Sequence, residues 1–188
     1  KAEGEAAALE TVPGAVVLRP SIVFGPEDKF FNRFADLTRY LPALPLIGGG
    51  TTKFQPVFVG DVAEVIARAV DGTVEGGRIY ELGGPEVKTF RECLELILSE
   101  IGRSRPLVSL PWGVARAQAS VMEWLPNPMM TRDQLKLLET DNVVSEKAVA
   151  EGRTLEGLGI QPTSLEAVLP SYLVRFKPHG QFDHKRTA

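Results

Sequence analysis

The hydrophobic residues of this chain fall into two alternating patterns, short segments typical of strands and longer stretches with a helical repeat. Predicted strands occupy residues 15–18, 54–59, 78–82 and 107–110, and the first of them is a continuous apolar run of the kind buried in a parallel sheet. Apolar residues three and four positions apart predict amphipathic helices, at residues 30–40, 61–70, 90–101, 112–125, 131–139 and 163–169. Strands that alternate with helices predict the α/β class.

Several helix starts carry the spacing of a capping box, in which a side chain accepts a helix N–H and a residue three positions on reaches back. The pairs are Asp61 with Glu64, Thr89 with Glu92, Thr131 with Gln134, and Thr163 with Glu166. Asp61 and Glu64 could also be read as paired catalytic carboxylates. Capping accounts for both residues, so we favour it.

Two helices have faces of special composition. The aromatic face of residues 30–40 carries Phe30, Phe31 and Phe34, which is more typical of a core than of a ligand cage. Residues 112–125, which begin with Trp112, combine small residues, Trp124 and few charges. That stretch is either packed in the core or is a docking face for a partner or a membrane surface.

The loop after the strand at residues 15–18 is the candidate ligand site. Pro20 has no N–H for a strand ladder and biases Arg19 towards extended backbone, so we expect the strand to stop there. Gly25 and Pro26 then turn the chain. Such a loop lies at the carboxyl edge of a sheet, where ligands bind in open α/β folds. An ordinary exit from a strand is the alternative.

Other candidate chemistry is sparse. Residues 48–50 are three glycines followed by a strand rather than a helix, so we interpret them as a turn and not a phosphate loop. Just before them, Pro42 and Pro45 are expected to interrupt regular secondary structure. His179 and His184 lack the spacing and company of metal ligands, and we predict no metal. Cys93 lies on an apolar helix face, so we expect it to be buried and unreactive.

Composition sets the broad class. The chain has 188 residues, 44% hydrophobic, with a formal charge of -3 and no dense basic run, which argues against a nucleic-acid surface. One cysteine allows no internal disulfide. No apolar run predicts a transmembrane span or a secretory signal. The first ten residues, KAEGEAAALE, have no cap and resemble the middle of a helix, so we expect the chain to be the later part of a longer protein.

Four stretches together resemble the extended or atypical short-chain dehydrogenase/reductase family, of the NAD-dependent epimerase/dehydratase type. They read KAEGE, LRPSIVFGPED, FQPVFVGDVAEVI and IYELGGPEVKTFRECLELI. A closer resemblance, to the nucleotide-binding accessory subunits of respiratory complex I and their bacterial relatives, lies in TRDQLKLLETDNVV and LEGLGIQPTSLE.

The resemblance implies a fold and an organisation. Residues 1–188 would be the C-terminal portion of a Rossmann-like doubly wound parallel sheet, with a small mixed α/β substrate-side lobe at roughly residues 30–50 and 78–140. The phosphate-binding N-terminal half would precede residue 1. The implied cofactor is NADP(H) or NAD(H).

The resemblance also implies site residues. Lys1 matches the lysine of the Tyr-x-x-x-Lys pair, which binds the cofactor ribose and assists the catalytic tyrosine, while Pro20, Ser21, Ile22 and Val23 would line the nicotinamide site. Backbone N–H groups of that loop would reach the carboxamide. The family's nucleotide-sugar epimerases have an arginine where this chain has Phe54, which cannot pair with a phosphate.

Two functions follow from the resemblance. The first is an accessory or assembly component of respiratory NADH-quinone oxidoreductase with a structurally bound dinucleotide, contacting other subunits or the membrane through residues 112–125. It would be cytoplasmic or peripheral on the inner membrane, on the matrix side in a eukaryote. The alternative is an active oxidoreductase, epimerase or dehydratase acting on a small or lipid-like substrate.

Because the phosphate loop of this family lies before residue 1, we expect residues 1–188 alone to show no measurable dinucleotide affinity. Fluorescence titration of the isolated segment with NADPH tests this. Saturable binding in the micromolar range would contradict it.

Overall fold

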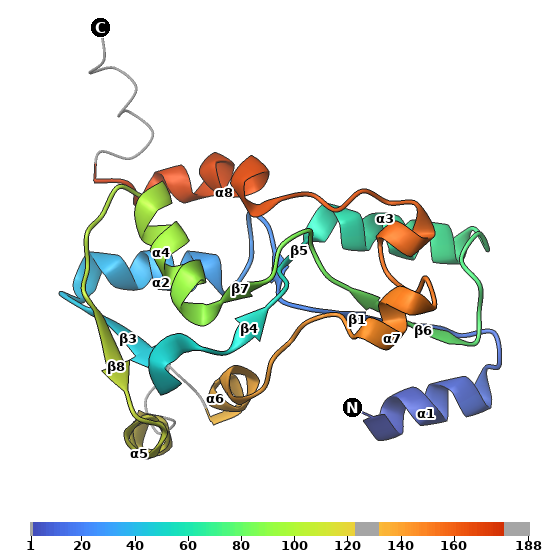
Figure 1. Cartoon of the computed structure of the whole chain (residues 1–188), viewed down its shortest axis with the longest axis horizontal. Helices are drawn as coiled ribbons and strands as arrows, with labels where there is room; N and C mark the ends of the chain where they lie inside the picture. The colour runs from blue at the N-terminus through green and yellow to red at the C-terminus, as the bar shows by residue number, and fades with distance from the viewer. Residues whose placement is uncertain (1, 123–131, 179–188) are drawn as a thin grey trace, which may run out of the picture. The chain divides into compact units, whose positions relative to one another are not determined.

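The computed structural model describes residues 2–122 and 132–178, and the described chain divides into two compact units (Figure 1). Unit 1 comprises residues 1–25, 55–87 and 143–168, and unit 2 comprises residues 26–54, 88–142 and 169–188. Each unit mixes helices with parallel strand pairs, so the α/β class is confirmed.

Unit 1 is built on two parallel strand pairs. β1 (Val16–Pro20) lies beside β6 (Arg78–Leu82), and β2 (Val23–Phe24) lies beside β5 (Val57–Phe58). The helical segments of this unit are α1 (Ala2–Thr11), α3 (Val59–Val70), α7 (Glu146–Ala150) and η2 (Glu156–Leu158). Its core is apolar, with Val57, Val65, Leu82 and Leu155 fully buried.

Unit 2 has a parallel pair, β3 (Leu44–Ile47) with β8 (Leu107–Leu110), and an antiparallel pair, β4 (Lys53–Phe54) with β7 (Lys88–Thr89). Its helical segments are α2 (Phe31–Tyr40), η1 (Gly48–Gly50), α4 (Phe90–Glu100), α5 (Trp112–Met122), α6 (Arg132–Glu139) and η3 (Val174–Phe176). The first residues of α8 (Leu165–Leu173) belong to unit 1, and its last residues belong to unit 2.

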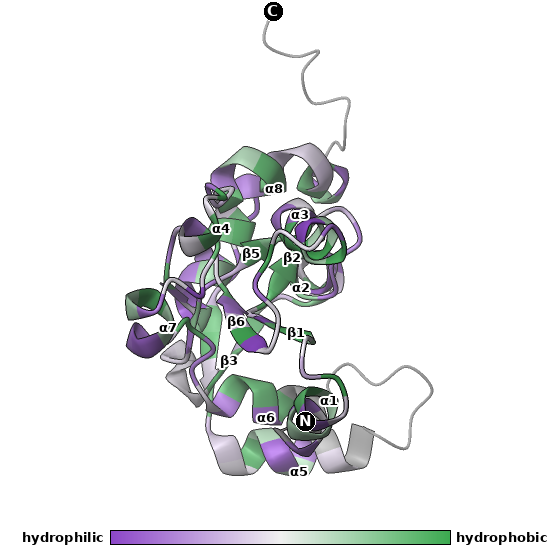
Figure 2. Cartoon of the chain, turned by 90° about the vertical axis from the view of Figure 1, so that its right-hand side faces the viewer, coloured by the Kyte–Doolittle hydropathy of each residue, from purple (hydrophilic) through white to green (hydrophobic). Residues whose placement is uncertain are grey.

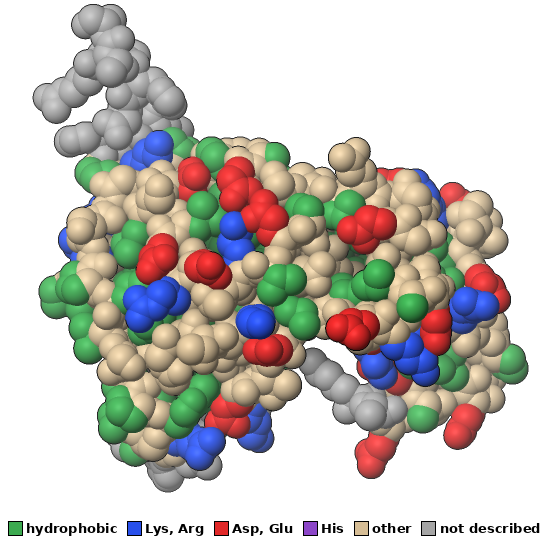
Figure 3. Space-filling model, in the orientation of Figure 1, with side chains coloured by type: hydrophobic (Ala, Val, Ile, Leu, Met, Phe, Trp, Pro, Cys, Tyr) green, Lys and Arg blue, Asp and Glu red, His purple; other side chains and the backbone are tan. Residues whose placement is uncertain are grey.

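Helices α6 and α7 each carry hydrophilic as well as hydrophobic residues (Figure 2). On the face drawn in Figure 3, charged side chains of both signs are interspersed. Within the described ranges, no helix is long and apolar enough to cross a membrane.

The strands at residues 78–82 and 107–110 are confirmed with the expected bounds, and the glycines of residues 48–50 form a turn of left-handed backbone. The expected strand at residues 54–59 is wrong. Pro56 has no N–H for a ladder, so β4 and β5 are separate strands with different partners, and Val59 already begins α3.

Two further boundaries differ from expectation. β1 runs through Pro20, which pairs in register with Leu82, because a proline is tolerated where a strand ends. β3 was not expected, since Pro45 lies within it. Its pairing with β8, and the bond from the Leu44 N–H to the Pro106 carbonyl (3.0 Å), stabilise the strand despite the proline.

An aromatic cluster forms much of the core of unit 2. The Phe30 ring lies 5.1 Å from the Phe34 ring and 5.9 Å from the Phe54 ring, and Phe34 lies 5.3 Å from Phe90. The core interpretation of this face is therefore confirmed. Phe54 is 1% exposed, so it is an apolar core position.

We expect Phe54→Ala to lower the free energy of unfolding by about 3–5 kcal/mol, because it leaves a cavity in this cluster. Phe54→Leu is the matched control and should cost less. Urea unfolding of the full-length protein, followed by circular dichroism, measures both. Equal, small losses would mean that Phe54 is not a core residue.

Candidate functional site

The candidate nicotinamide loop leaves the carboxyl end of β1, next to the carboxyl end of its parallel partner β6. Pro20 is exposed, Ser21 is buried at 9% exposure, and Ile22 and Val23 are half-buried. The Ile22 carbonyl accepts the Val57 N–H at 2.9 Å, and Val23 belongs to β2. The four residues thus form one continuous segment at a sheet edge, and their role in binding a nicotinamide stays a prediction.

Ser21 ties this loop to two other segments. Its N–H donates to the Leu82 carbonyl at 2.9 Å, and its hydroxyl oxygen accepts the Gln55 N–H at 3.2 Å. Because the Ser21 N–H is bonded to the sheet, it is not directed outward. It is therefore not one of the loop N–H groups that could donate to a carboxamide.

Gln55 is a residue of this region that the sequence did not single out. Its Nε2 donates to the Gly84 carbonyl at 2.8 Å, and its Oε1 accepts the Val144 N–H at 3.0 Å. One side chain thus joins the loop after β6 to the segment before α7. The partners lie far from Gln55 in sequence, so no local pattern could have revealed this role.

Gly84 allows the backbones to approach one another. A Cβ on Gly84 would overlap the Pro56 carbonyl oxygen, so the residue after β6 must be glycine for the two segments to pack. This glycine therefore has a packing role in the fold.

The expected capping box at Asp61 and Glu64 is wrong. α3 begins at Val59, two residues before Asp61, and its N-terminus has no side-chain cap. Asp61 is instead buried, at 7% exposure, and accepts hydrogen bonds from the N–H (2.7 Å) and the hydroxyl (2.9 Å) of Thr163. Glu64 forms an exposed ion pair with Arg68.

The contact with Asp61 also gives Thr163 a role, although Thr163 lies two residues before the first residue of α8. Its hydroxyl donates to Asp61, so the two residues hold the segment before α8 against α3. Both carboxylates of the supposed catalytic pair therefore have structural partners.

The capping box of Thr89 and Glu92 is confirmed. The Thr89 N–H donates to Glu92 at 2.6 Å, the Thr89 hydroxyl oxygen accepts the Glu92 N–H at 3.2 Å, and the bond from the Thr89 N–H lowers the pKa of Glu92. Cys93 is buried as expected, and burial raises the pKa of its thiol to about 12. The thiol stays neutral at physiological pH and is a poor nucleophile.

Other predicted positions lie outside the described residues, namely Lys1, Trp124, Thr131, His179 and His184. Residues 2–122 and 132–178 contain no group of three or more metal-ligating side chains that could hold an ion.

The fold neighbours define a class of protein. UDP-glucose 4-epimerase of Thermus thermophilus, solved with NAD, has a TM-score of 0.58 and 21% identity over 93% of this chain and 50% of its own. DesIV of Streptomyces venezuelae, a dTDP-glucose 4,6-dehydratase solved with NAD, has a TM-score of 0.60 and 20% identity over 90% of this chain and 46% of its own. The chain thus has the Rossmann-type fold of NAD-dependent epimerases and dehydratases.

The curated relatives narrow the identification. Mitochondrial NADH dehydrogenase (ubiquinone) 1 alpha subcomplex subunit 9 of Arabidopsis thaliana is 36% identical over 96% of this chain and 46% of its own length. The 40 kDa subunit of NADH-ubiquinone oxidoreductase from Neurospora crassa mitochondria is 26% identical over 97% of this chain and 47% of its own. No protein-family model matches. Both of these relatives are subunits of mitochondrial NADH dehydrogenase (NADH-ubiquinone oxidoreductase), and the chain spans about half of their length.

Asp61→Asn tests the buried contact in unit 1. The amide keeps the shape of the side chain but turns an NH₂ group towards a donor, so we expect a loss of about 1–3 kcal/mol in the free energy of unfolding. Glu64→Gln removes only an exposed ion pair and should change stability by less than about 0.5 kcal/mol. Similar losses from both variants in urea unfolding would favour the capping interpretation instead.

Proposed function

We propose that the chain is the C-terminal part of an accessory subunit of respiratory NADH dehydrogenase, and that the whole protein holds a nicotinamide dinucleotide. The observation that carries this proposal is the similarity to two such subunits over more than nine-tenths of the chain. The NAD-bound structures with the same fold support the choice of ligand.

The dinucleotide would place its nicotinamide against residues 20–23, at the carboxyl ends of β1 and β6. Ile22 and Val23 supply an apolar, half-buried surface suited to one face of the ring. Lys1 would bind the ribose, as the resemblance to the dehydrogenase family implies. The cofactor is NADP(H) or NAD(H), which differ by one phosphate in mass.

We propose that this dinucleotide is a structural component rather than a substrate. The candidate loop is fastened to the fold through Ser21, and Gln55 fastens the neighbouring loop after β6. A loop held in this way is suited to keeping one ligand in place. Phe54, buried in the aromatic cluster, cannot serve as the phosphate ligand that an arginine provides in nucleotide-sugar enzymes.

A working oxidoreductase, epimerase or dehydratase on a small or lipid-like substrate is the second candidate. The epimerases and dehydratases that share the fold favour it. In that case Lys1 would act with a tyrosine four residues before it, which would be the general acid and base.

The partners we propose are other subunits of the respiratory complex, at the matrix face of the mitochondrial inner membrane. α5 is the candidate contact. Trp112 packs over Gly48, whereas Val114 is 53% exposed, so the helix has a side that the fold buries and a side that it leaves open. We therefore propose core packing for the buried side of residues 112–122 and docking for the exposed side.

Mass spectrometry of the full-length protein, under native and then denaturing conditions, tests the cofactor proposal. We expect the native mass to exceed the polypeptide mass by one dinucleotide, which denaturation releases and whose mass identifies NAD(H) or NADP(H). The released nucleotide should keep its redox state after incubation of the native protein with candidate substrates.

A protein that is purified empty, binds added NAD(P) reversibly and turns it over would instead establish the second candidate. The same measurement on a Ser21→Val variant serves as a control on the site, because valine cannot accept the Gln55 N–H. If this variant retained the dinucleotide at full occupancy, the result would argue against residues 20–23 as the binding site of the nicotinamide.

A further inference from the structure

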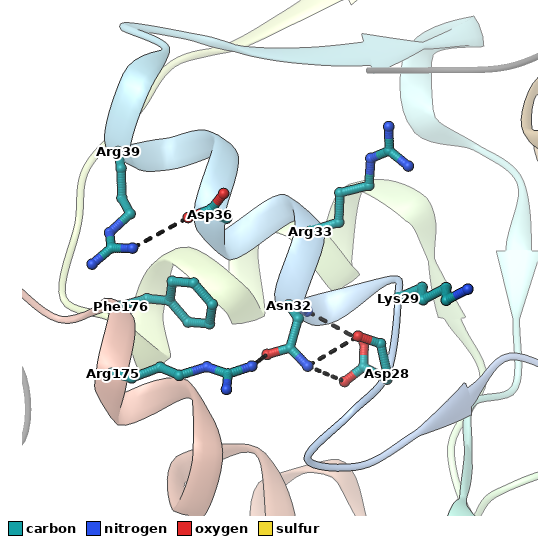
Figure 4. Close-up of a pocket in the computed structure, with 8 residues that line it drawn as sticks. All are labelled: Asp28, Lys29, Asn32, Arg33, Asp36, Arg39, Arg175 and Phe176. Carbon is teal, nitrogen blue, oxygen red and sulfur yellow. Dashed lines mark hydrogen bonds and ion pairs between the residues drawn. The ribbon is translucent and has the colours of Figure 1, made fainter. Parts of the chain in front are cut away.

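Unit 2 carries a separate basic pocket of about 570 Å³ where α2 and the segment before it meet η3 (Figure 4). Four basic side chains line it, those of Lys29, Arg33, Arg39 and Arg175. The chain as a whole has a formal charge of -3, so this pocket gathers positive charge against the overall balance. A cavity of this size is typical of small-ligand sites.

A buried ring holds two of the guanidinium groups in place. The Cζ atoms of Arg39 and Arg175 lie 5.6 and 5.0 Å from the centre of the Phe176 ring, within the range of cation–π attraction. Phe176 is 6% exposed, and its carbonyl accepts a hydrogen bond from Arg103 at 3.1 Å. The two guanidinium groups therefore have a fixed support, which lowers the entropy lost when they bind a ligand.

Asn32 orients Arg175 further. The Asn32 Oδ1 accepts a hydrogen bond from Arg175 at 2.6 Å, and its Nδ2 donates to the Pro26 carbonyl at 3.1 Å. Figure 4 shows Arg175 extended beside Phe176 towards Asn32.

The two carboxylates of the pocket offset only part of the charge of its four basic side chains. Asp28 accepts backbone N–H groups at the start of α2 and the Tyr172 hydroxyl, the latter at 2.6 Å, so its oxygens are held by neutral donors of the fold. Asp36 pairs with Arg39 at 3.3 Å, but both side chains are nearly half exposed. Water screens such an exposed ion pair, and a bound anion can take the place of the Asp36 carboxylate beside Arg39.

We propose that this pocket binds the phosphate groups of a ligand, with Arg39 and Arg175 as separate forked donors that lie on different sides of the Phe176 ring (Figure 4). Guanidinium groups match the oxygens of a phosphate two at a time and are more weakly hydrated than an ammonium group. A ligand with two phosphate groups offers one group to each arginine. Lys29 and Arg33 add a positive field around the site. This site is distinct from the candidate nicotinamide loop, all of whose residues belong to unit 1.

Calorimetric titration of the full-length protein with inorganic pyrophosphate tests the proposal. The protein is first loaded with NADPH and freed of unbound nucleotide, so that a dinucleotide site is occupied and no free NADPH competes for the pocket. We expect saturable binding that Arg39→Gln and Arg175→Gln each weaken about tenfold or more, because each removes a charge-assisted hydrogen bond. Arg91→Gln is the matched control, because Arg91 pairs with Glu95 on α4 and does not line the pocket.

A second arm identifies the source of the phosphate. Co-sedimentation is measured with vesicles of phosphatidylcholine alone and with added phosphatidic acid. Binding to pyrophosphate that depends on both arginines assigns a soluble ligand, and arginine-dependent binding only to phosphatidic acid vesicles assigns a lipid phosphate. Absence of binding in both arms, or equal weakening by Arg91→Gln, overturns the proposal. Arg39 is exposed enough for its variant to fold, so it decides the outcome if Arg175→Gln does not fold.

Discussion

The hydrogen bonds of Gln55, from its side chain and its backbone, are the interaction on which the arrangement around the candidate nicotinamide loop depends. The side-chain amide joins the loop after β6 to the segment before α7, and the Gln55 backbone N–H donates to the Ser21 hydroxyl oxygen. Half-buried polar groups of this kind are costly when unpaired, so the segments are strongly constrained once the amide is satisfied. The same constraint requires glycine at position 84, where the backbone passes too close to Pro56 for any side chain.

This constraint bears directly on function. Under the proposed function, the hydrogen bonds of Ser21 would hold residues 20–23 in place for long retention of one dinucleotide. In unit 2, Phe54 is an aromatic core residue, and the basic side chains that we propose for phosphate binding are Arg39 and Arg175 beside Phe176.

Local sequence signals were sound wherever a short range of residues decides the outcome. The capping box of Thr89 and Glu92 formed because both partners lie within one helical turn. The box expected at Asp61 failed because the helix began two residues earlier, and a threonine 102 residues away supplied better donors to the carboxylate. The strand expected at residues 54–59 failed for a similar reason, since its two halves have different partners.

The sequence by itself determined the α/β class, most of the helices, the turn at residues 48–50, the loop at residues 20–23 and the family resemblance, because periodicity, caps and motifs are local properties. Only the tertiary structure decided the roles of Asp61, Gln55 and Gly84, the pairing of β3 with β8, and the meeting of Arg39 with Arg175 across Phe176. Each of these depends on residues distant in the chain. Their energies come from satisfying buried polar groups or packing surfaces that come together only when the chain has folded.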